Sequence, residues 1–253
     1  MKYTVITGAS QGIGMEISVE FAKLGKNLIL IGRNREKLDI LANRLVEEFD
    51  IDVRLAISDL ANIDFIGEIT NQIGQCDVEI LVNNAGIGLG GKFSEQDCSE
   101  IAAMLNLNIH SVVQLTRLLL PKIVENRGSI INIASTAAFQ PVPFMAAYSA
   151  SKSFILNWSE SLGYELKKDG VTVLTFCPGW TKTDFIQTAK LESSKLLKPS
   201  LHTPQQVAKW VVNSWKKKKS LVIPGILNRF LIFGGRFAPR SVLLMISSKT
   251  VGH

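Results

Sequence analysis

The stretch Thr7-Gly8-Ala9-Ser10-Gln11-Gly12-Ile13-Gly14 follows an apolar run, Tyr3–Thr7, and precedes residues with helical spacing. Glycines here let the backbone turn sharply and approach a pyrophosphate, while the first turn of the helix offers free N–H groups to that anion. Tight strand–helix turns also occur without a ligand. The GxxxGxG spacing predicts a phosphate-binding loop here because it directly follows the first strand. The residues that we expect to hold the phosphates of a dinucleotide are Gly8, Ser10, Gln11, Gly12, Ile13 and Gly14.

Further apolar runs, rich in Val, Ile and Leu and without alternation, are typical of parallel strands covered on both faces. They are Asn27–Ile31, Val53–Ile57, Ile80–Val82, Ser129–Ile133, Val171–Phe176 and Leu221–Ile223. Helical patterns lie between them, for example Ile17, Phe21 and Leu24, or Leu38, Leu41, Leu45 and Phe49. This alternation predicts βαβ units and one parallel sheet in an α/β protein. Because no Pro/Gly/Ser-rich linker divides the chain, we expect one domain, residues 1–224, followed by a C-terminal tail, residues 225–253.

Charge is distributed unevenly along the chain. The 253 residues include 28 Lys and Arg and 22 Asp and Glu, for a formal net charge of +6. All 22 acidic residues lie within residues 1–192, whose balance is −5, whereas residues 193–253 carry 11 basic residues and no acidic one. An apolar share of 46% can build a core, which excludes a disordered protein. The basic tail carries no nucleic-acid recognition motif, so we expect no nucleic-acid partner.

The end of the second predicted strand bears on the choice between the two nicotinamide cofactors. An acidic residue there would bind the ribose 2′-OH of NAD. Here the strand ends Ile31-Gly32-Arg33-Asn34, without an acid, and the Arg33 guanidinium can meet a 2′-phosphate with a charged fork. Lys37 lies one helical turn further and can assist. We predict NADP (NADPH) over NAD; the alternative for Arg33 is a solvated surface residue.

Tyr148 and Lys152 are four residues apart in a segment with helical spacing, so their side chains share one helix face. A free tyrosine has a pKa of about 10 and is a poor acid–base catalyst near neutrality. A nearby ammonium stabilises the phenolate and lowers that pKa. The pair is therefore a sensible proton donor for a carbonyl that is being reduced. A YxxxK pair alone also occurs by chance in many helices, so its weight depends on the motifs around it.

With those motifs the sequence resembles the short-chain dehydrogenase/reductase family over residues 3 to about 224. The matching pieces, in the family's order, are Thr7–Gly14, Asp59-Leu60, Asn83-Asn84-Ala85-Gly86, Asn108, Ser135, Tyr148-Ser149-Ala150-Ser151-Lys152, Pro178-Gly179 and Thr183. The resemblance implies a Rossmann-type doubly wound parallel sheet of about seven strands in three α/β/α layers. It also implies an NAD(P)-dependent oxidoreductase that interconverts a carbonyl and an alcohol by hydride transfer.

The resemblance implies a role for each matched residue. Tyr148 would be the general acid in reduction, and Lys152 would hold the nicotinamide ribose and lower the tyrosine pKa. Ser135 would hydrogen-bond the substrate carbonyl, and Asn108 would hold a water that passes protons by way of Lys152. The other implied cofactor contacts are Asp59 and Leu60 at the adenine, Asn84, Ala85 and Gly86 near its ribose, and Pro178, Gly179, Thr181 and Thr183, the last at the carboxamide. Gln11 departs from the pattern, because many NADP-using members carry a basic residue there.

The residues before and after Tyr148 bear on the substrate. The stretch Gln140–Met145 with YSASKSF looks like the branch of hydroxysteroid dehydrogenases and long-chain 3-oxoacyl-CoA reductases. That similarity implies a lipophilic oxo substrate of lipid metabolism, a 3-oxoacyl thioester or a steroid-like ketone. Phe139, Phe144 and Met145 either line an apolar substrate pocket or pack as ordinary core. Residues 180–204 are predicted to form the substrate loop, with contacts from Trp180, Phe185 and Ile186.

The tail combines apolar and basic residues. Lys216–Lys219 are predicted to be a solvated helix end that complements the helix dipole. Ile226–Phe237 and Ser241–Ile246 are apolar segments interrupted by arginines. Such segments can lie in a membrane interface, or pack on the domain, on a partner subunit or over the substrate opening; we favour packing. The basic charge suits an anionic carrier such as a CoA or acyl-carrier thioester, or an anionic lipid surface.

Cysteine usage predicts the compartment. Cys76, Cys98 and Cys177 are odd in number and lack CxxC spacing, which predicts reduced, buried thiols in a cytoplasmic protein. No leader pattern precedes Tyr3 and no run reaches 18 apolar residues, so we expect neither a signal peptide nor a spanning helix, with peripheral membrane association through the tail as an alternative. No metal-ligand spacing appears, and the family resemblance implies a homodimer or homotetramer.

Two rival functions use the same fold. One is a non-catalytic dinucleotide-binding regulator, and the other is a membrane-surface protein whose tail is its main function. The set of Asn108, Ser135, Tyr148 and Lys152 argues against the regulator, because a sensor has no need of a proton relay.

Overall fold

A seven-stranded parallel sheet forms the centre of the computed structural model, which describes residues 1–185, 189 and 202–250. The strand order is β3-β2-β1-β4-β5-β6-β7. The strands are β1 (Lys2–Thr7), β2 (Asn27–Gly32), β3 (Val53–Ile57), β4 (Asp77–Asn83), β5 (Ser129–Ile133), β6 (Thr172–Phe176) and β7 (Leu221–Val222). The parallel sheet predicted from the apolar runs is confirmed, and so is the doubly wound arrangement that the family resemblance implies.

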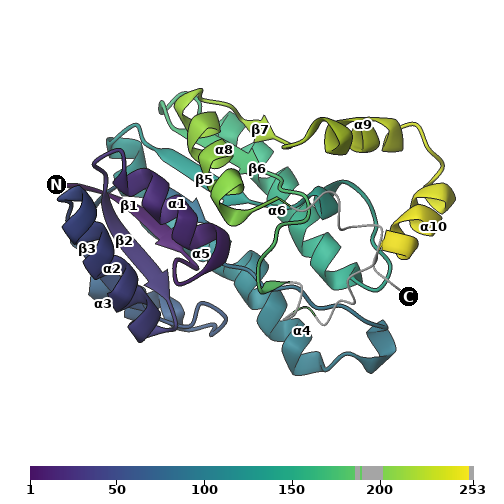
Figure 1. Ribbon diagram of the computed structural model, residues 1–253, viewed down its shortest axis with the longest axis horizontal. Coiled ribbons are helices and arrows are strands. Elements are labelled where there is room, and N and C mark those ends of the chain that lie inside the picture. Colours follow the sequence, from purple (N-terminus) through teal and green to yellow (C-terminus); the bar gives the residue numbers. More distant parts are fainter. Residues whose placement is uncertain (186–188, 190–201, 251–253) are drawn as a thin grey trace.

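Helices cover both faces of the sheet, as Figure 1 shows. Apolar side chains of α1 (Gly12–Ala22), α2 (Arg35–Phe49) and α8 (Pro204–Lys216) pack with Ile6 and Leu30 on one face. On the opposite face, α3 (Phe65–Ile73) and α5 (Ser111–Glu125) pack with Val5 and Ile29, and α6 (Ala146–Glu165) lies beside them. Neighbouring residues of β1 thus serve opposite faces, which explains why the strands lack polar alternation.

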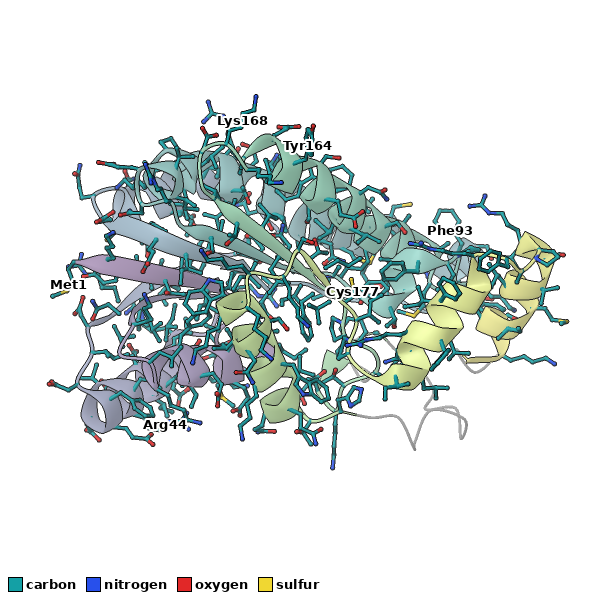
Figure 2. The ribbon with its side chains drawn as sticks, turned by 90° about the horizontal axis from the view of Figure 1, so that it is seen from above. Met1, Arg44, Phe93, Tyr164, Lys168 and Cys177 are labelled. Atoms are coloured by element: carbon teal, nitrogen blue, oxygen red, sulfur yellow. The ribbon has the colours of Figure 1, made fainter. Side chains whose placement is uncertain are left out.

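The remaining helices lie at the carboxyl ends of the strands or in the tail. They are η1 (Phe93–Glu95), α4 (Cys98–Leu105), a π turn (Asn106–His110), η3 (Thr136–Phe139), α9 (Ile226–Gly235) and α10 (Arg240–Thr250). No helix among the described residues is both long and apolar enough to cross a membrane. In Figures 1 and 2, α9 and α10 lie at the end of the molecule opposite Met1.

Two local expectations are wrong. Leu24 is not on the buried face of α1, because the helix ends at Ala22 and the chain turns at Gly25, which has a φ of 66° and leaves Leu24 38% exposed. Cys98 is exposed whereas the other two cysteines are buried. It begins α4, a helix whose buried residue is Met104, so its first turn faces solvent.

Candidate active site

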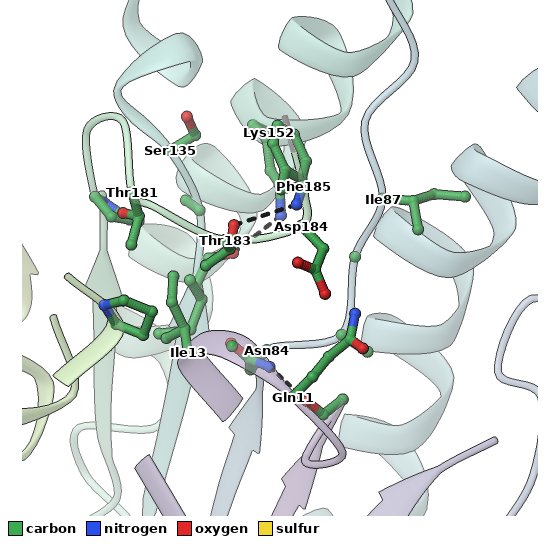
Figure 3. A pocket seen from close by; sticks show the side chains of 18 of the residues that line it. Gln11, Ile13, Asn84, Ile87, Ser135, Lys152, Thr181, Thr183, Asp184 and Phe185 are labelled. Atoms are coloured by element: carbon green, nitrogen blue, oxygen red, sulfur yellow. Dashed lines mark hydrogen bonds between the residues drawn. The ribbon is translucent and has the colours of Figure 1, made fainter. Parts of the chain in front are cut away.

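A cavity of about 940 Å³ opens at the carboxyl ends of the strands, where the order of the sheet reverses between β1 and β4 (Figure 3). Open parallel sheets bind ligands at this switch point. The structure brings most of the predicted residues to this one cavity; they are Gly8, Ser10, Gln11, Gly12, Ile13, Arg33, Lys37, Asp59, Leu60, Asn84, Ala85, Gly86, Ser135, Met145, Tyr148, Lys152, Pro178, Gly179, Trp180, Thr181, Thr183 and Phe185.

The glycine loop needs glycine for two different reasons. Gly8 and Gly12 have φ values of 65° and 59°, a left-handed conformation that side chains disfavour. Gly14 instead lies where the start of α1 touches the loop, because an added Cβ would come 2.3 Å from the Gly8 carbonyl oxygen and 2.5 Å from Nδ2 of Asn84. Gly14 does not line the cavity, so its part is close packing beneath the loop and not the direct contact that was expected.

The first turn of α1 has the donor set that a phosphate requires. Gln11, at the N-cap, makes no side-chain hydrogen bond to the helix, and the first turn holds no acidic residue. The N–H groups that begin a helix lack partners within it, and the dipole makes this end positive. Because Gln11, Gly12 and Ile13 line the cavity, the residues present fit a pyrophosphate at this end.

A threonine that the motif analysis did not single out holds this loop against the neighbouring strand. Thr7 Oγ1 accepts the N–H groups of Asn84 and Ala85, each at 2.9 Å. In return, Nδ2 of Asn84 donates to the Thr7 carbonyl at 2.9 Å and to that of Gly8 at 3.4 Å. The Asn84 amide therefore shapes the cavity by joining the ends of β1 and β4.

Basic side chains gather at the end of the cavity formed by β2 and β3. Nη1 of Arg33 lies 3.5 Å from Oδ2 of Asp59, and both side chains are largely exposed to solvent. Nζ of Lys37 donates to Oε1 of Gln11 at 3.2 Å. Arg33 and Lys37 are thus held by weak, exposed partners that a phosphate could replace.

Tyr148, Lys152 and Ser135 meet at the other end of the cavity. Tyr148 and Lys152 project from neighbouring turns of α6, and Nζ of Lys152 lies 5.9 Å from the centre of the Tyr148 ring. Nζ also donates to the Ile133 carbonyl at 3.1 Å, which anchors it at the end of β5. Ser135 caps η3, where its Oγ accepts the Ala137 N–H at 3.1 Å. The Ser135 side chain is close enough to Tyr148 to act on the pKa of its hydroxyl.

Burial controls the protonation of this group. Burial raises the pKa of Tyr148 to about 12, and the Ser135 side chain opposes that increase. Burial also lowers the pKa of Lys152 to about 8. Desolvation is the largest cause, and the Lys152 ammonium is not among the causes, so the expectation that Lys152 lowers the tyrosine pKa is not met in this structure. Tyr148 is held neutral near pH 7, which is the form that donates a proton.

Asn108 lies behind this group and does not line the cavity. It sits in the π turn between α4 and α5, and π turns are frequent at functional sites. Its Oδ1 accepts the Ile87 N–H at 3.0 Å, and its Nδ2 donates to the Ile87 carbonyl at 2.9 Å and to Ser151 Oγ at 3.1 Å. An added Cβ on Gly86 would be 3.1 Å from Oδ1 of Asn108 and 3.3 Å from Nζ of Lys152. Asn108 and Lys152 therefore converge on one point of the chain, where a larger residue than glycine would require these side chains to shift.

The segment after β6 forms the cavity wall opposite the glycine loop. Thr183 lies against Gly12, and its Oγ1 accepts the Phe185 N–H at 3.3 Å. The Phe185 ring lies 5.3 Å from that of Tyr148, so it covers the tyrosine ring. Most of the predicted substrate loop, including Ile186, lies outside the described residues.

The predicted apolar contacts divide into two groups. Met145 lines the cavity, but Phe139 packs with Ile155 and Cys177 beneath α6, and Phe144 packs beside Val142; neither phenylalanine lines it. Of the two alternatives for these phenylalanines, the structure shows packing against other apolar side chains, where both rings are partly buried. Four residues of α9 also line the cavity although the sequence did not indicate them; they are Leu227, Asn228, Leu231 and Ile232. Their leucine and isoleucine spacing was visible, but their proximity to β6 was not.

This fold and cavity define a dinucleotide-binding α/β protein with a serine, a tyrosine and a lysine at one end of the site. The chain belongs to the short chain dehydrogenase family, whose model matches residues 2–193.

Several proteins with assigned activities are similar to this chain. A very-long-chain 3-oxoacyl-CoA reductase from Danio rerio is 34% identical over 209 residues, which cover 80% of this chain and 64% of the relative, slightly under two thirds of its length. The ketoacyl reductase HetN from Nostoc is 30% identical over 95% of this chain and 86% of its own. A solved short-chain dehydrogenase from Sphingobium yanoikuyae, in complex with NADPH, superposes with a TM-score of 0.85 at 28% identity, covering 94% of this chain and 93% of its own.

Proposed function

We propose that this protein is an oxidoreductase that reduces a lipophilic ketone to an alcohol with NADPH. The observation that carries the proposal is the convergence of Ser135, Tyr148 and Lys152 at one end of a cavity whose other end holds an uncapped helix start. A dinucleotide that extends between these ends would bring its nicotinamide to the tyrosine. A regulator that only senses the dinucleotide would not need this group.

The chain's own residues then have distinct tasks. The cofactor supplies the hydride when it is bound. Ser135 and Tyr148 direct hydroxyl groups at the carbonyl oxygen, where negative charge develops as the carbonyl is reduced. Tyr148, held neutral, gives its proton to that oxygen. Lys152 holds the nicotinamide ribose, and its charge stabilises the phenolate that proton donation leaves. Phe185 covers the Tyr148 ring and keeps water from it.

The preference for NADPH over NADH rests on Arg33. No acid follows β2, and the Arg33 guanidinium is free to turn from its exposed pair with Asp59 toward a 2′-phosphate. Replacing Arg33 with alanine is expected to raise the KM for NADPH about tenfold, since one charge-assisted hydrogen bond contributes up to about 3 kcal/mol. The KM for NADH should stay unchanged. The control is Arg44→Ala, which removes an exposed arginine of α2 that does not line the cavity. Equal use of both cofactors by the wild-type protein would contradict the assigned role of Arg33.

The substrate that we propose is a long-chain 3-oxoacyl thioester or a steroid-like ketone, carried in the first case on CoA or acyl carrier protein. Support comes from the apolar walls supplied by Met145, Phe185, Leu227 and Leu231, and from the 3-oxoacyl-CoA and ketoacyl reductases among the relatives. The basic charge near the opening suits an anionic carrier. The cytoplasmic location and the homodimer or homotetramer stay predictions.

A screen of NADPH oxidation tests the proposal. The panel contains 3-oxoacyl thioesters of increasing chain length, steroid ketones, quinones and simple water-soluble ketones. We expect turnover that rises with the apolar length of the substrate, because longer chains cover more of the apolar wall. Tight NADPH binding without turnover of any carbonyl would favour a regulator on the same fold.

A further inference from the structure

Helix α9 presents an apolar face to solvent. Ile226, Phe230 and Phe233 follow the spacing i, i+4 and i+7 that places side chains on one side of a helix. We call them the α9 stripe, together with Phe237, which lies just after the helix with its ring centre 5.4 Å from that of Phe233. Their side chains are 62–76% exposed, and no residue of α9 is buried. Of the 18 large hydrophobic side chains that are exposed in the described part of the chain, ten lie between residues 226 and 246. Such a patch marks an interaction surface.

The charged side chains around the α9 stripe are all positive. Arg229 and Arg236 are seven residues apart and share one flank of the helix, and Arg240 begins α10. Within the described residues, none of these three arginines takes part in an ion pair. No acidic residue follows Glu192 in the sequence. The surface therefore fits an anionic partner.

A second cavity, of about 360 Å³, lies where α8 ends and α9 begins. Its lining includes Lys217, Lys219 and Arg229 together with Trp210 and Ile226. The lysines at the end of α8, predicted to be a solvated helix end, thus lie beside the first residue of the α9 stripe. Three cations beside an apolar stripe match the phosphates of lipid headgroups beside acyl chains.

The α9 stripe is continuous with the opening of the active-site cavity. Leu227 and Leu231 are 64% and 63% exposed, and both also line that cavity. They lie on the side of α9 between the stripe and the site. An acyl chain could therefore pass from the stripe into the cavity along one apolar surface.

From these features we propose that α9, the end of α8 and α10 dock on the surface of a bilayer that contains anionic lipids. The α9 stripe would lie at the boundary of headgroups and acyl chains, with Lys217, Lys219 and Arg229 near lipid phosphates. Amphipathic helices of this length and composition lie in the membrane interface, and neither α9 nor α10 is long enough to cross a membrane. Packing on the domain, on a partner subunit or over the substrate opening was the preferred prediction for the tail; for the α9 stripe we propose the membrane alternative instead, because its side chains are exposed.

A lipid surface explains this face better than two protein partners do. A second copy meeting the same face across a two-fold axis would bring two faces together on which Arg229, Arg236 and Arg240 are all positive. An acidic carrier protein would match the charges but would leave the exposed phenylalanines unexplained. Delivery of a lipophilic substrate from the bilayer is a consequence that also rests on the proposed function, whereas docking itself does not.

Flotation of the full chain with lipid vesicles tests the docking. We expect binding to vesicles of phosphatidylcholine with about 30% phosphatidylglycerol, and binding at least about fivefold weaker to phosphatidylcholine alone, because the cations add attraction only to anionic headgroups. Binding should also weaken between about 50 and 500 mM salt, where charges are screened. Equal binding to both kinds of vesicle, or to neither, would overturn the proposal.

Variants separate the two contributions. Phe230→Ser with Phe233→Ser should reduce vesicle binding at least about tenfold, because the helix loses apolar area that would enter the interface. Arg236→Gln with Arg240→Gln should reduce binding to anionic vesicles and weaken its salt dependence, while Lys217, Lys219 and Arg229 maintain the remainder. The matched controls are Tyr164→Ser and the charge-equivalent Arg44→Gln with Lys168→Gln, which lie away from α9 (Figure 2) and should bind like the wild type.

All of these side chains are exposed, so the variants are expected to fold, and retained NADPH binding with an unchanged melting temperature checks this directly. Unchanged vesicle binding by both α9 variants would overturn the proposal. So would a wild-type dimer that the phenylalanine variants dissociate, or an acidic carrier protein that binds in place of vesicles. None of these readouts depends on carbonyl reduction, so a protein without reductase activity can still support docking.

Discussion

The sheet and its flanking helices bury most of their large apolar side chains, whereas the α9–α10 tail exposes many of its own. In the first region, Ile6, Phe21 and Phe65 are fully buried, and the acidic residues of the chain all lie in or near it. In the second, Phe230 and Phe237 are 70% and 76% exposed, and every charge is positive. Burial fixes the geometry of the catalytic group, whereas the tail keeps its apolar area available for another surface.

Proton transfer and surface attachment therefore depend on different regions of the molecule. Protonation and positioning depend on desolvation, which only the first region provides. Surface attachment depends on exposed apolar area next to charge, which only the tail provides. Changes in the buried region and in the α9 stripe, whose residues do not line the active-site cavity, should therefore have nearly separate effects.

The largest expected effect comes from removing the phenolic hydroxyl in the buried region. Tyr148→Phe should lower kcat/KM for ketone reduction about 10³-fold, because general acid catalysis contributes about 10²–10⁴-fold. NADPH binding, measured by fluorescence titration, should be unchanged. The exposed Tyr164→Phe is the matched control with the same atom removed. Full activity of Tyr148→Phe would place the chemistry elsewhere.

A methyl group beneath the glycine loop should have the next largest effect. In Gly14→Ala the added Cβ meets backbone at 2.3 Å, so we expect a loss of about 1–3 kcal/mol in unfolding free energy, together with weaker NADPH binding. Gly67→Ala is the matched control, because nothing lies within 4 Å of its Cβ in the exposed first turns of α3. That variant should gain up to about 1 kcal/mol from helix propensity. Chemical denaturation of both variants measures whether the unfolding free energy falls in Gly14→Ala and rises in Gly67→Ala.

Much of the buried region follows from the sequence, since unbroken Val/Ile/Leu runs predict strands that are covered on both faces. β4 shows where this fails: only Ile80–Val82 was expected, but the strand begins at Asp77. Asp77 and Glu79 interrupt the apolar run, and partners distant in sequence satisfy them, since Asn126 donates to Asp77 and Nζ of Lys26 lies 2.8 Å from Glu79. Tertiary partners of this kind leave no local pattern.

The candidate site could likewise be predicted from the sequence only where its residues follow local motifs. The motifs identified Ser135, Tyr148 and Lys152, whose spacing is local to one helix and the turn before it. They could not show that desolvation, and not Lys152, sets the Tyr148 pKa, because burial depends on Phe185 and the rest of the fold. Nor could they show that Leu227 lines the same cavity, since that contact joins segments almost eighty residues apart in sequence.

The pH dependence of reduction should reveal the buried lysine. The pKa of Lys152 is about 8 in the folded protein, so kcat/KM should fall about tenfold for each pH unit above about 8 as its charge is lost. Stability should move the other way: the unfolded lysine, with a pKa near 10.5, binds more protons than the folded one between pH 8 and 10, so unfolding free energy rises there. A rate that stays level to about pH 10 would show that the charge of Lys152 is not needed.

The smallest effect is expected in the tail and separates the two regions most directly. Phe233→Ala should change the unfolding free energy by less than about 0.5 kcal/mol, because the ring is 62% exposed and its ring partner is the equally exposed Phe237. Phe21→Ala, which removes a fully buried ring of α1, should cost about 3–5 kcal/mol. Urea denaturation of both variants measures the difference. A large loss in Phe233→Ala would mean that the tail is part of the folded core in solution, and the exposed face of α9 would then need a protein cover instead of a lipid one.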